Sequence, residues 1–549
     1  LLLVLISFFS FCMYLYGQPN KILKAGPSTE NLDLTKYSNV IYISQAKGSD
    51  KDGNGSKSNP WNTIIYALNQ VTENTVNSET ALIVAEGTYS YGTIQMKSYV
   101  DILGGFNETN WDRDIYKYKT IIDGNYSRRI VIGADNARID GCTIKKGISR
   151  YEGGGILCDD TSPEISNCFI VDNYTLEPEN FNNTRIHQKG NEGGGIACLY
   201  NATPVIRNNI FYKNRTSIGD GGALSFYGWV RQRHGTDRRI ENNFMEGSGR
   251  AKVLNNVFIQ NTAGVNDIYR TRSSNGGAIS CSNEARPIIE NNVIVSNRAK
   301  GNSDAGGIYV EDFSYPTIKD NWIVGDVSDD DGGGMYIMRL SHALVENNFI
   351  AGNWTTGGGA GGIRLSKEGR ATINNNVIVY NQSGGAVQCI DSYMELKNNI
   401  LMHNKGKISI RYTNTFSYFI PSIVENNIIQ DNTGKIDLEL RKGEEINFKN
   451  NNTKDTAIGS NNSYSQIPFE DNLISGRIKN HYFNESHYQT VIETDSGNNE
   501  KSLIGRVIHI GNFWSVITQV KDNKINFWGN ISVHDLDLSE FQILPSYNK

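Results

Sequence analysis

A series of tyrosine, arginine and glutamine side chains recurs at regular spacing in the middle of the chain, and these residue types are suited to binding a sugar chain. Each follows an apolar residue that opens a short segment, at Tyr309, Tyr336, Arg364, Gln388 and Arg411. Side chains of a strand alternate between its two faces, so these residues point outward if the opening residues are buried. Aromatic rings stack on sugars, and arginine binds a carboxylate with two parallel hydrogen bonds. The series therefore predicts a surface for an acidic glycan.

Charged residues flank this series and supply groups for acid–base chemistry, at Glu311, Asp312, Arg339, Lys367 and Asp391. Cleavage of a uronate chain by β-elimination needs a neutralised carboxylate, a base and an acid. We expect Arg364 and Arg339 to bind the carboxylate, and Lys367 or Tyr336 to transfer the proton. Tyr309 and Gln388 are expected to bind substrate beside them. The alternative is a solvated sheet face with a ladder of tyrosines.

A second column, mostly acidic, precedes pairs of glycines, at Glu152, Glu192, Asp220, Asn275, Asp304 and Asp331. An acid before a glycine corner can simply accept backbone N–H groups. Stacked carboxylates can also hold Ca²⁺, which prefers several oxygen ligands. Alternatively, Asp304 and Asp331 form an acid–base pair, because like charges on neighbouring elements raise the pKa of one of them.

These residues are positioned by a repeat that begins with glycines and continues through an Asn-Asn pair. Gly332-Gly333-Gly334-Met335 leads to Val345-Glu346-Asn347-Asn348, and Gly276-Gly277-Ala278-Ile279 leads to Ile289-Glu290-Asn291-Asn292. Uninterrupted copies recur every 23–29 residues or so, roughly the period of solenoid proteins. Three short strands per repeat and an Asn-Asn corner indicate an all-β, right-handed parallel β-helix. One Asn of each pair is expected to turn inward and bond its counterparts one coil away.

The predicted solenoid covers residues 38–455 and has different structures at its two ends. The segment from Pro60 to Val71 has helical periodicity and predicts an N-terminal capping helix. Residues 456–549 are expected to form an irregular segment and a small antiparallel β unit that closes the far end. Insertions at about residues 176–188, 227–250 and 264–275 interrupt the repeat and predict loops where binding residues gather.

With these repeats, the sequence from about Val40 to about Asn452 resembles the pectate-lyase-like superfamily of right-handed parallel β-helix proteins. That scaffold carries lyases, hydrolases, epimerases and adhesins, so the resemblance implies the fold more strongly than an activity.

A local motif in the second insertion is more specific. Arg233-His234-Gly235 resembles the Arg-His-Gly motif of the alginate lyase and chondroitinase B family. The resemblance implies that Arg233 is a catalytic acid that works beside a lysine base and a calcium ion. No upstream segment matches the family's lysine. Trp229, Arg233 and His234 are therefore predicted to contact substrate.

The composition and the first residues bound the protein's partners and location. The net charge is −5, and no tract of lysines and arginines suggests a nucleic-acid partner. Residues 1–17 form an apolar stretch typical of a secretory signal whose start is missing, and it is too short to span a membrane. We expect an exported, monomeric protein in the periplasm, at the cell surface or outside a bacterial cell.

Three functions are compatible with these features. The first is a polysaccharide lyase that cleaves an anionic, uronate-containing glycan in a groove on the β-helix, with Ca²⁺ as a possible cofactor held by Asp304, Asp331 and Glu311. The second is a glycoside hydrolase that uses Glu311, Asp304 and Asp331 as its carboxylates. The third is a secreted glycan-binding or adhesin solenoid without catalysis.

Overall fold

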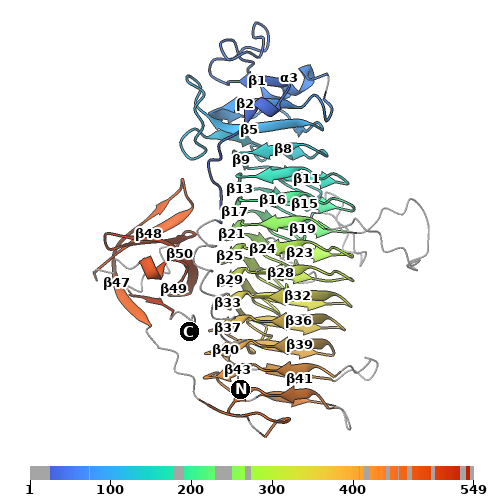
Figure 1. Cartoon of the computed structure of the whole chain (residues 1–549), viewed down its shortest axis with the longest axis vertical. Coiled ribbons are helices and arrows are strands. Elements are labelled where there is room, and N and C mark those ends of the chain that lie inside the picture. The colour runs from blue at the N-terminus through green and yellow to red at the C-terminus, as the bar shows by residue number, and fades with distance from the viewer. Residues whose placement is uncertain are drawn as a thin grey trace, which may run out of the picture.

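The protein is an elongated solenoid with a small β-barrel packed against its side (Figure 1). The computed structural model describes residues 25–72, 74–177, 191–228, 250–265, 274–406, 408–412, 421–434, 436–440, 445–455, 457–465, 473–495, 501–531 and 540–544. Within these residues, every strand pair of the solenoid that joins one coil to the next is parallel, so the predicted parallel β-helix is confirmed.

Four parallel sheets run the length of the solenoid, and we number them in the order in which one coil visits them. Sheet 1 has 14 described strands, which are β1 (Asn39–Ile43), β2 (Thr80–Ala85), β5 (Val100–Phe106), β8 (Arg138–Asp140), β12 (Glu164–Ser166), β16 (Val205–Arg207), β20 (Lys252–Leu254), β24 (Ile288–Glu290), β28 (Thr317–Lys319), β32 (His342–Glu346), β36 (Arg370–Asn374), β39 (Tyr393–Lys397), β42 (Ile423–Glu425) and β45 (Asn447–Lys449). Sheet 2 has 13, which are β3 (Gly87–Tyr89), β6 (Thr120–Asp123), β9 (Cys142–Lys145), β13 (Phe169–Val171), β17 (Ile210–Tyr212), β21 (Val257–Ile259), β25 (Val293–Val295), β29 (Trp322–Val324), β33 (Phe349–Ala351), β37 (Val377–Val379), β40 (Ile400–Met402), β43 (Ile428–Gln430) and β46 (Asn452–Thr453).

The other two sheets complete each coil. Sheet 3 has seven two-residue strands, which are β10 (Ile148–Ser149), β14 (Tyr174–Thr175), β18 (Arg215–Thr216), β22 (Thr262–Ala263), β26 (Arg298–Ala299), β30 (Val327–Ser328) and β34 (Trp354–Thr355). Sheet 4 has 12 strands, which are β4 (Ile94–Gln95), β7 (Val131–Ile132), β11 (Ile156–Asp159), β15 (Ile196–Leu199), β19 (Leu224–Tyr227), β23 (Ile279–Ser282), β27 (Ile308–Val310), β31 (Met335–Met338), β35 (Ile363–Ser366), β38 (Val387–Ile390), β41 (Ile408–Arg411) and β44 (Asp437–Glu439). The prediction of three strands per coil missed the short sheet 3.

The Asn-Asn corner lies between sheets 1 and 2 and works as predicted. The second Asn of each pair is buried, and Asn321 shows the pattern: its Nδ2 donates to Asn348 Oδ1 at 3.0 Å and to the Ile289 carbonyl at 2.9 Å. The backbone N–H of Asn321 donates to the same Oδ1 at 2.9 Å. The first residue of the pair has a positive φ, 55° at Asn347, which asparagine tolerates better than most residues. The pair therefore both turns the chain and bonds one coil to the next.

A second buried ladder, which the sequence analysis missed, lies between sheets 2 and 3. In three consecutive coils its residues are Asn297, Asp326 and Asn353. Asp326 Oδ1 accepts from the backbone and side-chain N–H groups of Asn297, whereas its Oδ2 has no hydrogen-bond partner among the described residues. Burial raises the pKa of Asp326 well above its usual range. The ladder thus contains one carboxyl, whose neutral form burial favours, at a position where the neighbouring rungs have an amide.

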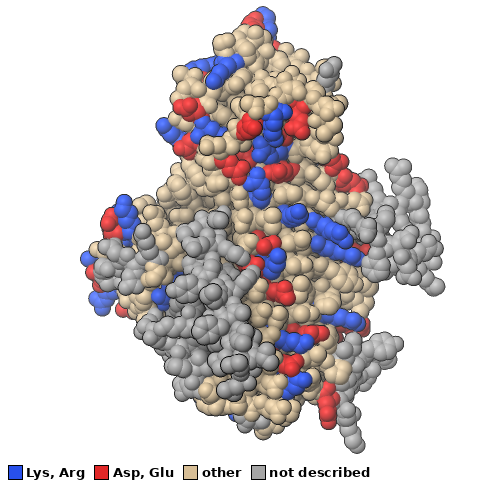
Figure 2. All heavy atoms as spheres, viewed as in Figure 1, with Lys and Arg blue, Asp and Glu red and all other residues tan. Residues whose placement is uncertain are grey.

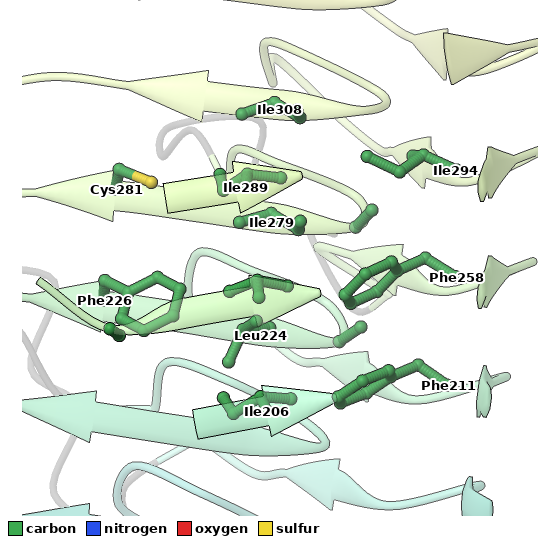
Figure 3. Packing of buried hydrophobic residues seen from close by; sticks show 14 of the residues in the cluster. Ile206, Phe211, Leu224, Phe226, Phe258, Ile279, Cys281, Ile289, Ile294 and Ile308 are labelled. Carbon is green, nitrogen blue, oxygen red and sulfur yellow. The ribbon is translucent and has the colours of Figure 1, made fainter. Parts of the chain in front are cut away.

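The core is built from columns of identical or similar side chains, one per coil (Figure 3). Leu224, Ile279 and Ile308 occupy the same position in successive strands of sheet 4. Phe211 and Phe258 stack on sheet 2 with their ring centroids 4.5 Å apart. Because these side chains are buried, the residue after each sheet 4 opener points outward, which is the premise of the predicted site.

The N-terminal end is capped as expected. Helix α3 (Ile64–Gln70) begins after Thr63, whose side chain accepts the N–H of Tyr66. It buries Ile64, Ala67 and Leu68 against the first strands of the stack. A short 3₁₀ turn, η1 (Leu34–Lys36), precedes β1. No helix in the described part of the chain has the length and apolar character to cross a membrane.

The C-terminal segment forms the expected antiparallel β unit, but its predicted place was wrong. Its strands close into a barrel in the order β47 (Ile474–Asn484), β48 (Gln489–Thr494), β51 (Lys524–Trp528), β50 (Phe513–Lys521), β49 (Val507–Ile510) and β52 (Glu540–Ile543), with the turn η2 (Lys501–Leu503) between β48 and β49. The barrel does not close the far end. It folds back and packs on the outer face of sheet 2, as Figure 1 shows.

The corner after sheet 2 explains why the barrel docks there. This corner has a positive φ in each coil, and it is glycine at Gly325 and Gly352. A Cβ atom at either residue would approach Trp514 to 2.5 or 2.4 Å. In the preceding coil Ser296 Oγ donates to the Trp514 carbonyl at 2.9 Å. Further up the solenoid, Tyr116 stacks on His487 with centroids 4.6 Å apart. The barrel therefore contacts the coils from Tyr116 to Gly352. The two glycines leave the space that Trp514 of the barrel fills.

Candidate active site

The outward series on sheet 4 is confirmed in four of its five members. Tyr309 pairs with Tyr336, Tyr336 with Arg364, and Arg364 with Gln388 on neighbouring strands. The next residue in register is Ser409, not Arg411, which instead pairs with Ile390. The placement of Arg411 in this series was wrong because the segment before β41 is two residues out of step with the copies above it. Arg411 lies two residues further along the strand and bonds Asp437, which is in register with Ser409.

The two tyrosines do not offer open faces for stacking on a sugar. Tyr309 and Tyr336 are 2% and 3% exposed, and they pack with Ala305 and Met338 on the outside of the sheet. The hydroxyl of Tyr309 donates to Glu311 Oε2 at 3.1 Å, and that of Tyr336 bonds Ser366 Oγ. Burial raises the pKa of both phenols. The expected role of Tyr309 in stacking and of Tyr336 as a proton-transfer group does not fit this environment.

The acidic column is a ladder between coils. The backbone N–H of Asn275 donates to Asp220 Oδ1 at 2.6 Å, that of Asp304 to Asn275 Oδ1 at 2.9 Å, and that of Asp331 to Asp304 Oδ1 at 3.1 Å. Acceptance of backbone N–H groups, the structural interpretation, is therefore correct for these residues. It does not account for the choice of residue, because the amide of Asn275 fills the same position without a charge.

At the end of this ladder, Asp304 and Asp331 have different neighbours. Arg364 Nη2 lies 3.2 Å from Asp331 Oδ2, and Arg364 Nη1 donates to Gln388 Oε1. Asp304 instead accepts the Asp331 N–H. The equivalent position in the next coil is Gly359, where a Cβ atom would lie 2.0 Å from Asp331 Oδ1. The glycine thus leaves room for the Asp331 carboxylate, and Arg364 holds it.

These neighbours separate the two carboxyls electrostatically. Burial raises the pKa of Asp304 to about 8, and the charges of Asp331 and Asp330 add to the rise. Burial also raises the pKa of Asp331, but there the Arg364 charge is the largest influence in the opposite direction. Lys367, which lies exposed in the turn after β35, lowers both. With a pKa of about 8, Asp304 is a carboxyl that favours its protonated form at neutral pH. A pair of carboxyls in which one is protonated and the other is held by a cation is the arrangement of an acid and a nucleophile or base.

A third carboxyl lies beside this pair. Asp304, Asp330 and Asp331 can each place one oxygen so that all three lie within 4.8 Å of one another. Carboxylate oxygens suit Ca²⁺, so the donor set fits the predicted calcium ion in chemistry. Arg364 already provides a positive charge to Asp331, which weakens the need for a metal. Asp330 was not among the predicted metal ligands.

The remaining predicted residues form a separate ion pair at the other end of the same strands. Arg339 Nη1 donates to Glu311 Oε2 at 2.6 Å and lies 3.8 Å from Asp312 Oδ1. Glu311 is 4% exposed, whereas the Arg339 side chain is 44% exposed. Glu311 is therefore occupied by Arg339 and Tyr309 and does not join the Asp304–Asp331 pair. Trp229, Arg233 and His234 lie outside the described residues.

A family model described as a right-handed β-helix region matches residues 266–422, a span that includes Asp304, Asp331 and Arg364. This match agrees with the predicted hand of the solenoid. The chain is a right-handed parallel β-helix protein.

Other comparisons of this β-helix protein are distant. No curated protein matches it. The crystal structure of the native GH136 lacto-N-biosidase from Eubacterium ramulus is 12% identical, and the match covers 73% of this chain and 68% of that chain with a TM-score of 0.33. A likeness at this TM-score does not bear on the activity of the β-helix protein, so the function has to be argued from its own residues.

Proposed function

We propose that the protein is a carbohydrate-active enzyme that hydrolyses a glycosidic bond, with Asp304 as the general acid and Asp331 as the nucleophile. The observation that carries this proposal is the unequal environment of two carboxyls at equivalent positions of neighbouring coils. Both are half-buried, but Asp304 accepts a backbone N–H whereas Asp331 is paired with Arg364. Burial favours the protonated form of the first at neutral pH, and the arginine favours the charged form of the second.

The spacing favours retention of configuration. Oxygens of Asp304 and Asp331 lie within 4.8 Å of one another. Retaining glycosidases place their carboxyls about 5–5.5 Å apart, whereas inverting enzymes leave roughly 6.5–9.5 Å for a water molecule. Asp304 therefore gives its proton to the leaving oxygen as the glycosidic C–O bond breaks, and an Asp331 oxygen bonds the anomeric carbon. Water then attacks that carbon, its proton passes to Asp304, and Asp331 is released as the carboxylate.

The environment of the arginines argues against the lyase as the first candidate. Arg364 and Arg339 are expected to neutralise a uronate, but they already pair with Asp331 and Glu311. One observation still supports a lyase on an anionic glycan, namely the cluster of Asp304, Asp330 and Asp331. A Ca²⁺ ion held there would supply the positive charge for a uronate carboxylate. Lys367, whose charge reaches both aspartates, is then the candidate base.

The test is turnover on a panel of polygalacturonate, alginate, xylan and N-acetylated oligosaccharides, each with calcium and with chelator. Reducing ends measure any cleavage, and ultraviolet absorbance of a new C4–C5 double bond measures elimination. We expect reducing ends without absorbance and without an effect of chelator. Asp304→Asn should lower kcat by 10²–10⁴-fold, the usual contribution of a general acid. Absorbance that disappears with chelator would instead establish the calcium-dependent lyase.

A matched control separates chemistry from folding. Glu346→Gln removes a carboxylate from sheet 1 in the coil that also carries Asp331, and it should leave kcat unchanged. Wild-type kcat in Asp304→Asn with every active substrate would contradict the proposal. Export, predicted from residues 1–17, agrees with a polymeric substrate outside the cell, and N-terminal sequencing of the protein from the culture medium tests it.

A further inference from the structure

A two-residue turn follows each strand of sheet 4 in the coils around the site. Both residues of the turn have positive φ, as in Asp312-Phe313 and Arg339-Leu340, where the second residues have φ of 60° and 59°. The equivalent second residues in the flanking coils are Glu284, with φ of 67°, and Glu368, with φ of 63°. The position is therefore polar on either side and apolar in the two coils that carry Asp304 and Asp331.

These apolar side chains are exposed and adjacent. Phe313 is 39% exposed and Leu340 37%, and the Phe313 N–H donates to the Arg339 carbonyl at 3.1 Å, which joins the two turns. Tyr315, two residues beyond Phe313, is 39% exposed, and the Arg286 guanidinium lies 5.1 Å from its ring centroid. We call Phe313, Tyr315 and Leu340 the corner platform.

The backbone conformation at Phe313 and Leu340 is unfavourable for bulky apolar residues. Left-handed φ values suit glycine, asparagine and aspartate, and bulky residues adopt them at the expense of stability. Glu284 and Glu368 have the same conformation in the flanking coils, so the fold imposes it, and the apolar residue type is what distinguishes the two coils of the platform. Here Phe313 and Leu340 combine strain with exposure of apolar surface to water. Neither property stabilises the fold.

We propose that the corner platform is a subsite that binds an uncharged sugar unit of the glycan cleaved at Asp304 and Asp331. The inference rests on the proposed function, because it extends the same substrate along the same two coils. The chain is extended from the glycine corner to the turn, so the platform lies roughly 15 Å from the carboxyl pair, which is several sugar units along the chain. Aromatic and aliphatic side chains bind the apolar face of a sugar ring.

The charges beside the platform favour a neutral sugar over a uronate. Two cations adjoin the platform, Arg286 over the Tyr315 ring and Arg339 next to Leu340. Arg339 is bonded to Glu311 at 2.6 Å and lies 3.8 Å from Asp312, so two protein carboxylates balance its charge at the end of the platform formed by Phe313 and Leu340. A carboxylated sugar placed on Phe313 would have to compete with these carboxylates.

The variant that tests the subsite is Phe313→Asn combined with Leu340→Asn. Asparagine tolerates the left-handed conformation, so the turn should fold at least as well as in the wild type. Binding is measured by calorimetry in an Asp304→Asn background, with neutral xylo-oligosaccharides and N-acetylated oligosaccharides of two to eight units and with oligogalacturonates of the same lengths. We expect Kd to rise at least tenfold for long neutral chains and to stay unchanged for the shortest ones.

The matched control is Glu284→Asn with Glu368→Asn, which changes the same turn position in the flanking coils and should leave Kd unchanged. Equal Kd values for the platform variant and its background at every chain length would overturn the subsite, as would the failure of all these chains to bind the background protein. Tighter binding of oligogalacturonates that also depends on Phe313 would overturn the preference for a neutral sugar. Loss of long-chain binding together with undiminished turnover by Asp304→Asn would support the subsite and reject the catalytic pair.

Discussion

The outer face of sheet 1 and the glycine corner before sheet 4 belong to the same coils but arrange their charges in opposite ways. On sheet 1, Glu290, Lys319 and Glu346 follow one another in register, and Lys319 Nζ lies 3.2 Å from Glu290 Oε2. Glu425 and Lys449 repeat the pattern further along, at 3.3 Å. Figure 2 shows acidic and basic side chains interspersed along the solenoid. In the glycine corner before sheet 4, Asp304 and Asp331 place two acids at equivalent positions of neighbouring coils, with Asp330 beside them.

The difference teaches which charged columns of a solenoid indicate function. Neighbouring coils bring equivalent residues to about 4.8 Å, so every charge has a close neighbour of the same column. Alternating signs satisfy this geometry at little cost, as on sheet 1. Two acids in register raise each other's pKa, and an enclosed position increases the effect. Such an arrangement destabilises the fold and therefore indicates a site.

The largest effect that separates the two faces is a pH dependence of turnover. Asp304 must be protonated to act as the acid, and its pKa is raised to about 8. On the alkaline side of the pH–rate profile, we expect kcat/KM to be constant up to this pH and to fall tenfold per pH unit above it. A pH–rate profile of the wild type and of Lys319→Gln, which alters only the sheet 1 face, should give the same limb. A limb near pH 4 would show that Asp304 is not the acid.

Asp326 provides a second carboxyl with a raised pKa for comparison, because it lies in the buried ladder and not at the site. Its folded pKa is raised, so folding takes up a proton above the unfolded pKa of about 3.9 and becomes less favourable as pH rises. Asp326→Asn restores the amide of the neighbouring rungs. We expect the free energy of unfolding to increase by about 1–3 kcal/mol at pH 7, and by less at pH 4.5. Urea unfolding at the two pH values measures it, and an equal gain at both would contradict the assignment of a neutral acid.

The same reasoning predicts that Asp304→Asn stabilises the protein that it inactivates. Asn Oδ1 can still accept the Asp331 N–H, whereas the repulsion between the two acids is removed. The raised pKa of Asp304 lowers wild-type stability as pH rises from about 4 to about 8, so the gain should be present at pH 8 and absent at pH 4. We expect it to be on the order of 1 kcal/mol, as found when active-site residues are relieved of their electrostatic strain. A loss of stability at pH 8 would mean that the carboxyl has a structural partner.

The smallest effect belongs to the ordinary face. Lys319→Gln breaks the ion pair with Glu290 on the partly exposed surface of sheet 1. Exposed pairs contribute roughly 0.2–1 kcal/mol, so the free energy of unfolding should fall by less than about 0.5 kcal/mol, and less again in high salt. Thermal unfolding at low and high ionic strength measures both. A large, salt-insensitive loss would show that the two faces are not different in kind.

The repeat predicted the solenoid well because local sequence and global fold use the same period. The Asn-Asn pairs predicted both the corner and the inward-pointing amide, because asparagine tolerates a positive φ and can hydrogen-bond its counterparts in a buried ladder. The ladder through Asp326 was missed because its residues are single and spaced apart from the pairs. The side of the solenoid on which the barrel docks was also missed, although Gly325 and Gly352, in a column where other coils have larger residues, mark it in retrospect.

The site was predicted in part. Column spacing was sufficient to bring Asp304 above Asp331 and to place Arg364 next to Tyr336. It could not show that Tyr309 and Tyr336 would be buried, or that Arg339 and Arg364 would pair with protein carboxylates, because these depend on rotamers and on neighbouring coils. Arg411 was misplaced because a short irregular segment shifts the register by two residues. Phe313 and Leu340 could have been found from sequence by comparing the turn position across coils.

The barrel on the flank has a consequence for how the molecule comes apart. A solenoid with contacts only between neighbouring coils can fray from either end, one coil at a time. Here the pairs Tyr116–His487 and Gly352–Trp514 tie coils that are far apart in the stack to a single closed unit. Opening any coil between them exposes surface shared with the barrel, so this stretch should unfold as one cooperative block. Asp304 and Asp331 belong to that block, and their amides should be among the slowest to exchange with solvent.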